Sequence, residues 1–196
     1  MIFVRNPPKP PDYVFGLATP ADMLRKLGWE IRQFRDRLAT ASEDLWGRSD
    51  LYYIAFNVAV TAFHCGDWAW RSLGAKAQMQ VAEEYAFTRS GNLKTDTVRF
   101  MDAMCKRRSI DLCRSIANGS KHMGTSGKPN KPFSVSTIWE FRSDEDDGRT
   151  VTYLAVQDGD AVLRVEAVFD DAFRYWESMY RNFGFVEDRF IDADET

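Results

Sequence analysis

Apolar side chains recur at helical spacing through most of the first 120 residues. The first clear stripe has intervals of three and four residues and comprises Leu24, Leu27, Ile31, Phe34 and Leu38. Thr19-Pro20-Ala21-Asp22 precedes it, with a threonine cap, a proline in the first turn and an acid three residues after the cap. The pattern predicts an amphipathic helix that begins at Thr19.

Four more helices are predicted before residue 123, at about Asp50–Leu73, Ala75–Thr88, Thr95–Cys105 and Ser109–Ser120. The last two are also compatible with one bent helix. The segment from Leu51 to Leu73 is long and apolar enough to raise the question of a membrane span. It contains His64, Asp67 and Arg71, and charges are costly at the centre of a bilayer. We therefore predict a buried central helix and no membrane contact.

After Pro129 the apolar period changes from helical to alternating. A first strand is predicted around Val135–Phe141, a second at Val151–Val156 and a third at Ala161–Phe169. Asp158-Gly159 predicts a tight hairpin turn between the second and third strands. A last helix follows, capped by Asp170 or Asp171 and closed by Gly184.

These elements predict an α+β fold: an N-terminal bundle of four or five helices, a three-stranded antiparallel meander and a C-terminal helix. Residues 1–18 hold four prolines and predict an extended arm. Residues 19–184 are predicted to form a single α+β domain, with residues 19–123 helical, 132–169 the meander and 170–184 the last helix. Residues 185–196 form an acidic tail.

Composition limits the classes of function. The chain has 196 residues, a net charge of -3 and 44% hydrophobic residues, which fits one packed domain without a global attraction to nucleic acid. Cys65, Cys105 and Cys113 show no CxxC spacing and predict reduced thiols in a cytoplasmic protein. Charge is uneven along the chain. The segment Lys94–Lys131 has nine basic and three acidic residues, whereas Glu140–Thr196 has sixteen acidic and six basic ones.

The only two histidines of the chain lie in polar clusters within this apolar helical region. One cluster is His64-Cys65-Gly66-Asp67, followed by Trp68, and the other is Asn118-Gly119-Ser120-Lys121-His122. Histidine changes charge near neutral pH and serves both acid–base catalysis and metal binding. The two clusters are therefore the candidate site.

Each cluster belongs to a polar stripe on its helix. The first stripe covers about a third of the circumference and comprises Asp50, Asn57, Thr61, His64, Asp67 and Arg71. It lacks Lys and Glu, which are typical of a solvent-facing helix, and so favours a partly buried hydrogen-bond network. The second stripe comprises Asp111, Arg114, Asn118, Lys121 and His122. If the stripes face each other, their residues converge on one polar cleft.

Three interpretations of this cleft are open. The polar groups form a structural hydrogen-bond network in a non-catalytic interaction protein. Alternatively, they cleave RNA without a metal or cofactor, because a histidine acid–base with Arg and Lys to stabilise the phosphate is sufficient. As a third interpretation, His64, Asp67 and His122 bind a divalent metal. This interpretation has no HExxH motif in its support, and Lys121 would repel the cation.

The pairing of a His-x-x-Asp-Trp helix with a later Asn-x-x-Lys-His resembles a group of uncharacterised bacterial and phage helical proteins over about residues 50–123. The matching residues are His64, Asp67, Trp68, Ala117, Asn118, Gly119, Lys121 and His122. A looser similarity is to HEPN-type helical domains, many of which are RNases. Their motif is an arginine and a polar residue, then four to six residues and a histidine. Arg114-Ser115 and His122 resemble it with a longer spacing, seven residues between Arg and His.

The HEPN resemblance implies RNA as a partner, and a homodimer, because such domains usually build their site across a dimer. For an enzyme we predict phosphodiester cleavage of RNA with His122 as the acid–base. Arg114 and Lys121 would hold the phosphate, Asn118 would complete the cleft, and His64 with Asp67 would form a second acid–base or orienting pair.

Overall fold

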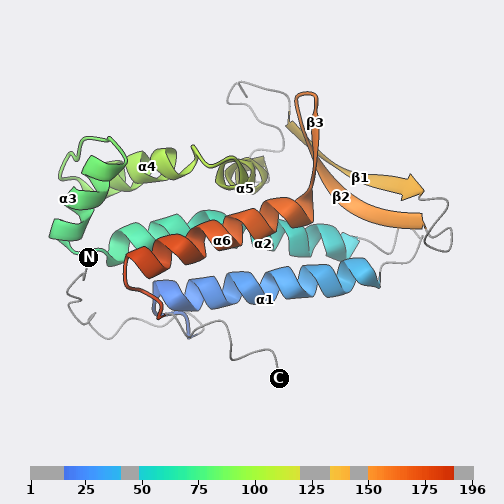
Figure 1. The fold of residues 1–196 in the computed structure, drawn as a ribbon, viewed down its shortest axis with the longest axis horizontal. Helices are drawn as coiled ribbons and strands as arrows, with labels where there is room; N and C mark the ends of the chain where they lie inside the picture. Colours follow the sequence, from blue (N-terminus) through green and yellow to red (C-terminus); the bar gives the residue numbers. More distant parts are fainter. Residues whose placement is uncertain (1–15, 41–48, 120–132, 142–149, 188–196) are drawn as a thin grey trace.

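The computed structural model describes residues 16–40, 49–119, 133–141 and 150–187. Within these ranges the elements are α1 (Pro20–Ala39), α2 (Ser49–Ser72), α3 (Ala75–Glu84), α4 (Leu93–Met104), α5 (Arg108–Gly119), β1 (Phe133–Phe141), β2 (Thr150–Asp158), β3 (Ala161–Arg164) and α6 (Val165–Asn182). The protein is mostly helical with a small antiparallel sheet, which confirms the predicted α+β class (Figure 1).

The start of α1 follows from its sequence. The Thr19 hydroxyl accepts a hydrogen bond from the Asp22 backbone N–H at 3.2 Å, and the Asp22 carboxylate accepts one from the Thr19 N–H at 2.9 Å. This reciprocal pair satisfies two N–H groups that a helix start otherwise leaves without partners. The apolar stripe of α1 is buried as predicted at Leu24, Leu27 and Phe34.

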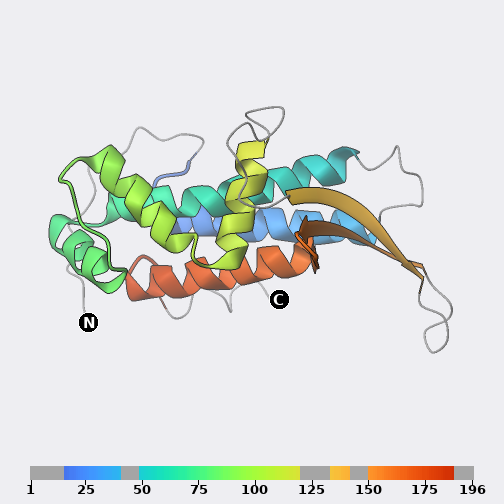
Figure 2. The same cartoon turned by 90° about the horizontal axis from the view of Figure 1, so that it is seen from above.

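The helices form layers around one core. α1 lies below α2 and α6, and α3, α4 and α5 lie above them, as Figure 1 shows from the side. Figure 2 shows α5 crossing over both α2 and α6, and it contacts both. The largest fully buried side chains of the middle layer are Trp70 of α2 and Trp176 and Tyr180 of α6. α2 is therefore the central helix, as predicted.

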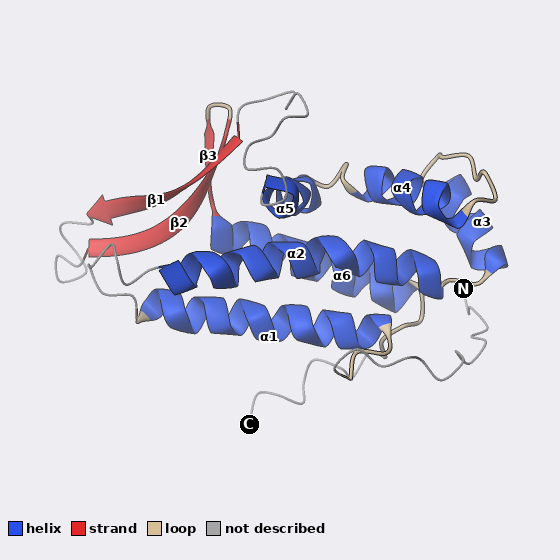
Figure 3. Cartoon of the chain, turned by 180° about the vertical axis from the view of Figure 1, so that it is seen from behind, coloured by secondary structure: helices blue, strands red, loops and turns tan. Residues whose placement is uncertain are grey.

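The sheet has the order β1-β2-β3 and lies at the end of the molecule where α6 begins (Figure 3). β2 pairs antiparallel with both neighbours, with Val156 opposite Val135 on one side and Leu163 on the other. Leu154 and Val156 are buried and belong to the same core as the helices. Gly159 has a φ of 61°, which fits the predicted tight turn between β2 and β3.

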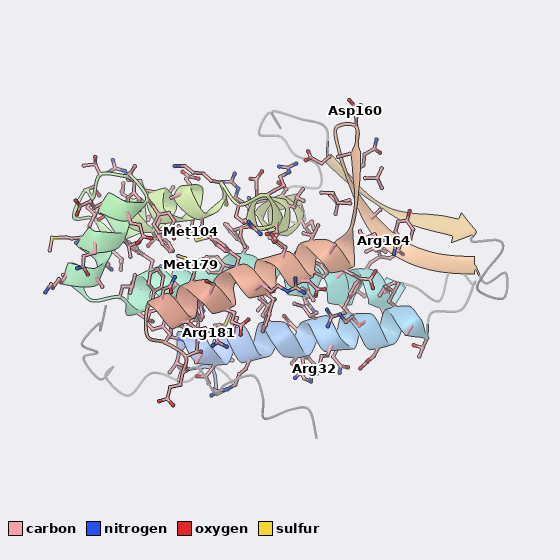
Figure 4. The ribbon with its side chains drawn as sticks, in the orientation of Figure 1. Arg32, Met104, Asp160, Arg164, Met179 and Arg181 are labelled. Atoms are coloured by element: carbon pink, nitrogen blue, oxygen red, sulfur yellow. The ribbon has the colours of Figure 1, made fainter. Side chains whose placement is uncertain are left out.

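The boundary between the sheet and the last helix corrects two predictions. β3 ends at Arg164 and α6 begins at Val165, so the predicted strand to Phe169 and the predicted helix start at residue 170 are wrong. Alternation along 161–169 fits a strand, but Val165, Val168 and Phe169 also have helical spacing, and all three are buried as α6 residues. Figure 4 shows Asp160 at the tip of the hairpin and Arg164 at the base of β3.

The helices between residues 75 and 119 differ from prediction at their ends. α3 ends at Glu84 rather than near Thr88, and α4 begins at Leu93 because the Asn92 side chain accepts the N–H of Thr95 at 3.1 Å and caps it. α4 and α5 are separate helices. Gly184, with a φ of 70°, follows α6 as predicted. Residues 1–15 of the predicted arm and 188–196 of the predicted tail lie outside the described residues.

Candidate functional site

The predicted polar stripe of α2 is mostly exposed. Asn57, His64 and Arg71 are exposed and Asp67 is half-buried, whereas Thr61 alone among the stripe residues is buried, at 2% exposure. α2 contacts α1, α4, α5 and α6, and small apolar side chains such as Ala55, Ala62 and Ala69 occupy the buried sides. A partly buried network along the whole stripe is therefore a wrong prediction. We call this surface the α2 face. It comprises four exposed residues, Tyr53, Asn57, His64 and Arg71, and two half-buried ones, Val60 and Asp67.

Thr61 belongs to a small polar cluster that the sequence did not reveal. Lys26 of α1 donates hydrogen bonds to the Thr61 hydroxyl and the Glu30 carboxylate, both at 2.5 Å. The Glu30 side chain is only 9% exposed, and its second carboxylate oxygen accepts no hydrogen bond from the described residues. Glu30 lies three residues after Leu27 and four before Phe34, on the apolar stripe of α1. An acidic residue at such a position was the sequence feature that could have indicated this polar cluster.

Cys65 and Gly66, the two middle residues of the first histidine cluster, contribute to core packing. Burial raises the pKa of the Cys65 thiol to about 12, and the Cys65 carbonyl accepts a 2.7 Å hydrogen bond from Tyr180. A side-chain carbon added at Gly66 would clash with the sulfur of Met101 and come within 2.9 Å of the Trp176 ring. The glycine at position 66 therefore allows α4 and α6 to approach α2 closely. The Cys65 thiol, with its raised pKa, is a poor nucleophile at neutral pH.

The other two cysteines are equally unsuited to nucleophilic chemistry. Burial raises the pKa of Cys105 to about 11 and raises the pKa of Cys113 still further. All three cysteines carry free thiols, as predicted.

Asp67 is engaged by its own helix. Its carboxylate is 3.1 Å from Nε of Arg71, one turn further along α2. Within the described residues no group of three His, Cys, Asp or Glu side chains is arranged to hold a metal ion. The predicted metal set also needs His122, which lies outside those residues, so the metal site stays a prediction.

The second stripe is described only in part. Arg114 forms ion pairs with Asp102 at 3.0 Å and with Asp111 at 2.7 Å, so two acids already bind the guanidinium that was predicted to hold a phosphate. Asn118 is exposed near the end of α5. Lys121 and His122 lie outside the described residues, and the meeting of the two imidazoles stays a prediction. The helices that carry the stripes do pack against each other, because α5 contacts α2.

The uneven charge of the sequence is partly explained by internal ion pairs. Arg107 donates to Asp171 of α6 through Nε at 2.8 Å, and this hydrogen bond lowers the pKa of Asp171. Arg108 forms ion pairs with Asp111 at 2.7 Å and with Asp158 at the end of β2. The basic segment around α5 therefore binds acids of the acidic C-terminal part, which reduces its availability to nucleic acid.

A shallow hollow of about 380 Å³ lies beside the first turns of α1. Its lining residues are Gly16, Leu17, Asp22, Arg25, Lys26 and Trp29. Each of its two cations is matched by an acid, because Arg25 pairs with Asp22 at 2.7 Å and Lys26 pairs with Glu30. The hollow therefore has no excess positive charge for an anionic ligand.

Comparison of the chain with protein-family models, curated proteins and solved structures gives no match. Among the described helices, none combines the length and the apolar composition that a bilayer crossing requires.

Proposed function

We propose that this chain is a non-catalytic interaction protein that binds its partner through the α2 face. The observation that carries the proposal is an exposed helix surface without Lys or Glu. Tyr53 is 69% exposed, and exposed Asn57 and His64 follow at helical spacing. Protein interfaces are enriched in aromatic residues and depleted in Lys and Glu, whereas an ordinary wet helix face is rich in both.

The contacts of the candidate catalytic residues support this choice. Arg114 is held by Asp102 and Asp111, and Asp67 is paired with Arg71. Phosphate binding by Arg114 would have to displace two carboxylates that already neutralise it. Ion pairing thus accounts for Arg114 and Asp67 without a catalytic role for either residue. As part of the proposal we place the protein in the cytoplasm, where its three free thiols stay reduced.

Site-specific photo-crosslinking tests this function. A benzophenone amino acid in place of Tyr53 should give a discrete adduct in the cells that make the protein, and Asn57→Lys should abolish it because a lysine disrupts the contact surface. The matched control carries the same group in place of Arg174, an exposed residue of α6. Absence of an adduct, or equal adducts from both positions, would contradict the proposal.

A second candidate function is metal-independent cleavage of RNA, supported by the contact between α2 and α5. Exposed His64 and exposed Asn118 lie on these two helices, and the HEPN resemblance supplies roles for Arg114, Lys121 and His122. A bacterial or phage origin rests on the resemblance alone.

The cleavage assay uses the full chain, a short RNA and EDTA. This function requires His64→Ala and His122→Ala to lower the rate by about 10²-fold or more with an unchanged melting temperature. Cleavage that survives both substitutions would exclude it.

A further inference from the structure

Four exposed polar and charged residues along α2 have a twofold pattern. Asp50 and Arg71 lie at equal distances from a point between Val60 and Thr61, and Asn57 and His64 lie at equal, shorter distances from the same point. Asp50, Asn57, His64 and Arg71 are all exposed. When two such helices lie antiparallel around this point, each of these residues faces its complement on the other copy.

The charges at the two ends of α2 complement each other. At the start of the helix, Asp50 pairs with Arg37 of α1 and is still 50% exposed. At the end, Arg71 pairs with Asp67 and is 57% exposed. Antiparallel pairing sets Asp50 of one copy beside Arg71 of the other. The four groups Arg37, Asp50, Arg71 and Asp67 then alternate in sign across the interface.

We propose that the partner of the α2 face is a second copy of this chain, bound antiparallel along α2 with the twofold axis beside Val60. The inference rests on the function proposed above and is derived from α2 alone. It uses neither Arg114 nor His122.

The contacts in this dimer follow from the spacing. At about 1.5 Å per residue, Asp50 and Arg71 are about 32 Å apart along the helix, so one interface spans most of α2. The Asn57 amide and the His64 imidazole of the second copy are hydrogen-bonding partners, and the contact occurs twice by symmetry. Tyr53, one turn from Asn57, supplies a large apolar surface beside each of these contacts.

A charge-exchange experiment tests the pairing by analytical ultracentrifugation of the full chain. The wild-type chain should dimerise, and Asp50→Arg or Arg71→Glu alone should weaken the dimer about tenfold or more, because each places like charges together twice. An equimolar mixture of these two variants should dimerise again, since both charge pairs are then opposite in sign. The control Arg174→Glu on α6 should dimerise like the wild type.

Cross-linking tests the position of the axis. A cysteine in place of Val60 should link to its own counterpart through a short bismaleimide, because the two residues meet at the axis. A cysteine in place of Tyr53 should not, since the two copies of that position lie about 22 Å apart along the helices. Circular dichroism confirms that each variant is folded.

The outcomes separate this inference from the proposed function. A wild-type chain that stays monomeric, or a mixture of variants no better than either alone, overturns the dimer. If the Tyr53 position still gives an adduct with another molecule, the interaction function survives with a different partner. If neither dimer nor adduct forms, both proposals fail.

Discussion

The contact between α2 and α6 and the junction around the start of α5 are held by different forces. Between α2 and α6, Trp176 and Tyr180 are fully buried. At the junction, Arg107 and Asp171 form an ion pair whose side chains are 52% and 38% exposed. Burial of a large side chain contributes several times more stability than an ion pair in water. Packing therefore fixes the helix layers, and the exposed ion pair adds only a small stabilisation at the junction.

The largest effect is expected where the core is deepest. Trp176→Ala should lower the free energy of unfolding by about 3–5 kcal/mol, because the substitution removes a fully buried ring and leaves a cavity. Equilibrium denaturation by urea measures the change. A loss below about 1 kcal/mol would mean that the core closes around the missing ring and that packing contributes little to the contact between α2 and α6.

The close approach of the helices at Gly66 is the next test. Gly66→Ala should cost about 1–3 kcal/mol, since the added carbon meets the Met101 sulfur and the Trp176 ring. Gly74→Ala is the matched control, because no atom lies within 4 Å of its added carbon. Equal losses in the two variants would show that contact with α4 and α6 does not explain the glycine at position 66.

Asp96 tests a buried polar contact that belongs to neither region. Its carboxylate accepts hydrogen bonds from the Ser90 N–H at 2.6 Å and the Gly91 N–H at 3.1 Å, and the bond from Ser90 is the main cause of its lowered pKa. A depressed pKa stabilises the fold above the unfolded value, near 3.8, and the gain is lost as the pH falls through the folded pKa.

Asp96→Asn should therefore lower the melting temperature at pH 7, by less than the core substitutions do. The difference from the wild type should shrink as the pH falls below 3.8. Thermal melts between pH 2 and pH 7 measure this profile. A difference that stays constant over that range would show that the charge of Asp96 is not what stabilises the turn.

The smallest effect is expected at the exposed junction. A double-mutant cycle with Arg107→Ala and Asp171→Ala should give a coupling of about 0.2–1 kcal/mol, falling as salt is added. Denaturation at low and high salt measures it. A coupling as large as the loss from Gly66→Ala would remove the distinction between the two regions.

The sequence correctly predicted those features of the fold that depend on residues close together in the chain. The Thr19 cap, the extent of α2 and the Asp158-Gly159 turn are set by neighbouring residues, and the structure contains all three. The junction of β3 and α6 was ambiguous because its apolar residues fit both a strand and a helix. Tertiary packing decides such cases, since the helix buries Val168 and Phe169 against the bundle.

The candidate site was less predictable than the fold. The absence of Lys and Glu from the α2 stripe predicts burial within the fold, but interfaces with a partner share this composition. Which face of a helix is buried depends on the helices that pack against it, and the sequence of α2 alone does not identify those helices. Lys26, the partner of Thr61, lies 35 residues away in the chain, so no local motif could have identified the pair.

The position of α6 has a consequence for synthesis of the chain. α6 contacts α1 and α2, and it contributes Phe169, Trp176 and Tyr180 to their shared core. While a ribosome is still adding residues 165–182, the N-terminal helices have no partner for the apolar surface that α6 covers. Nascent chains should therefore be targets for chaperones until α6 has emerged from the ribosome.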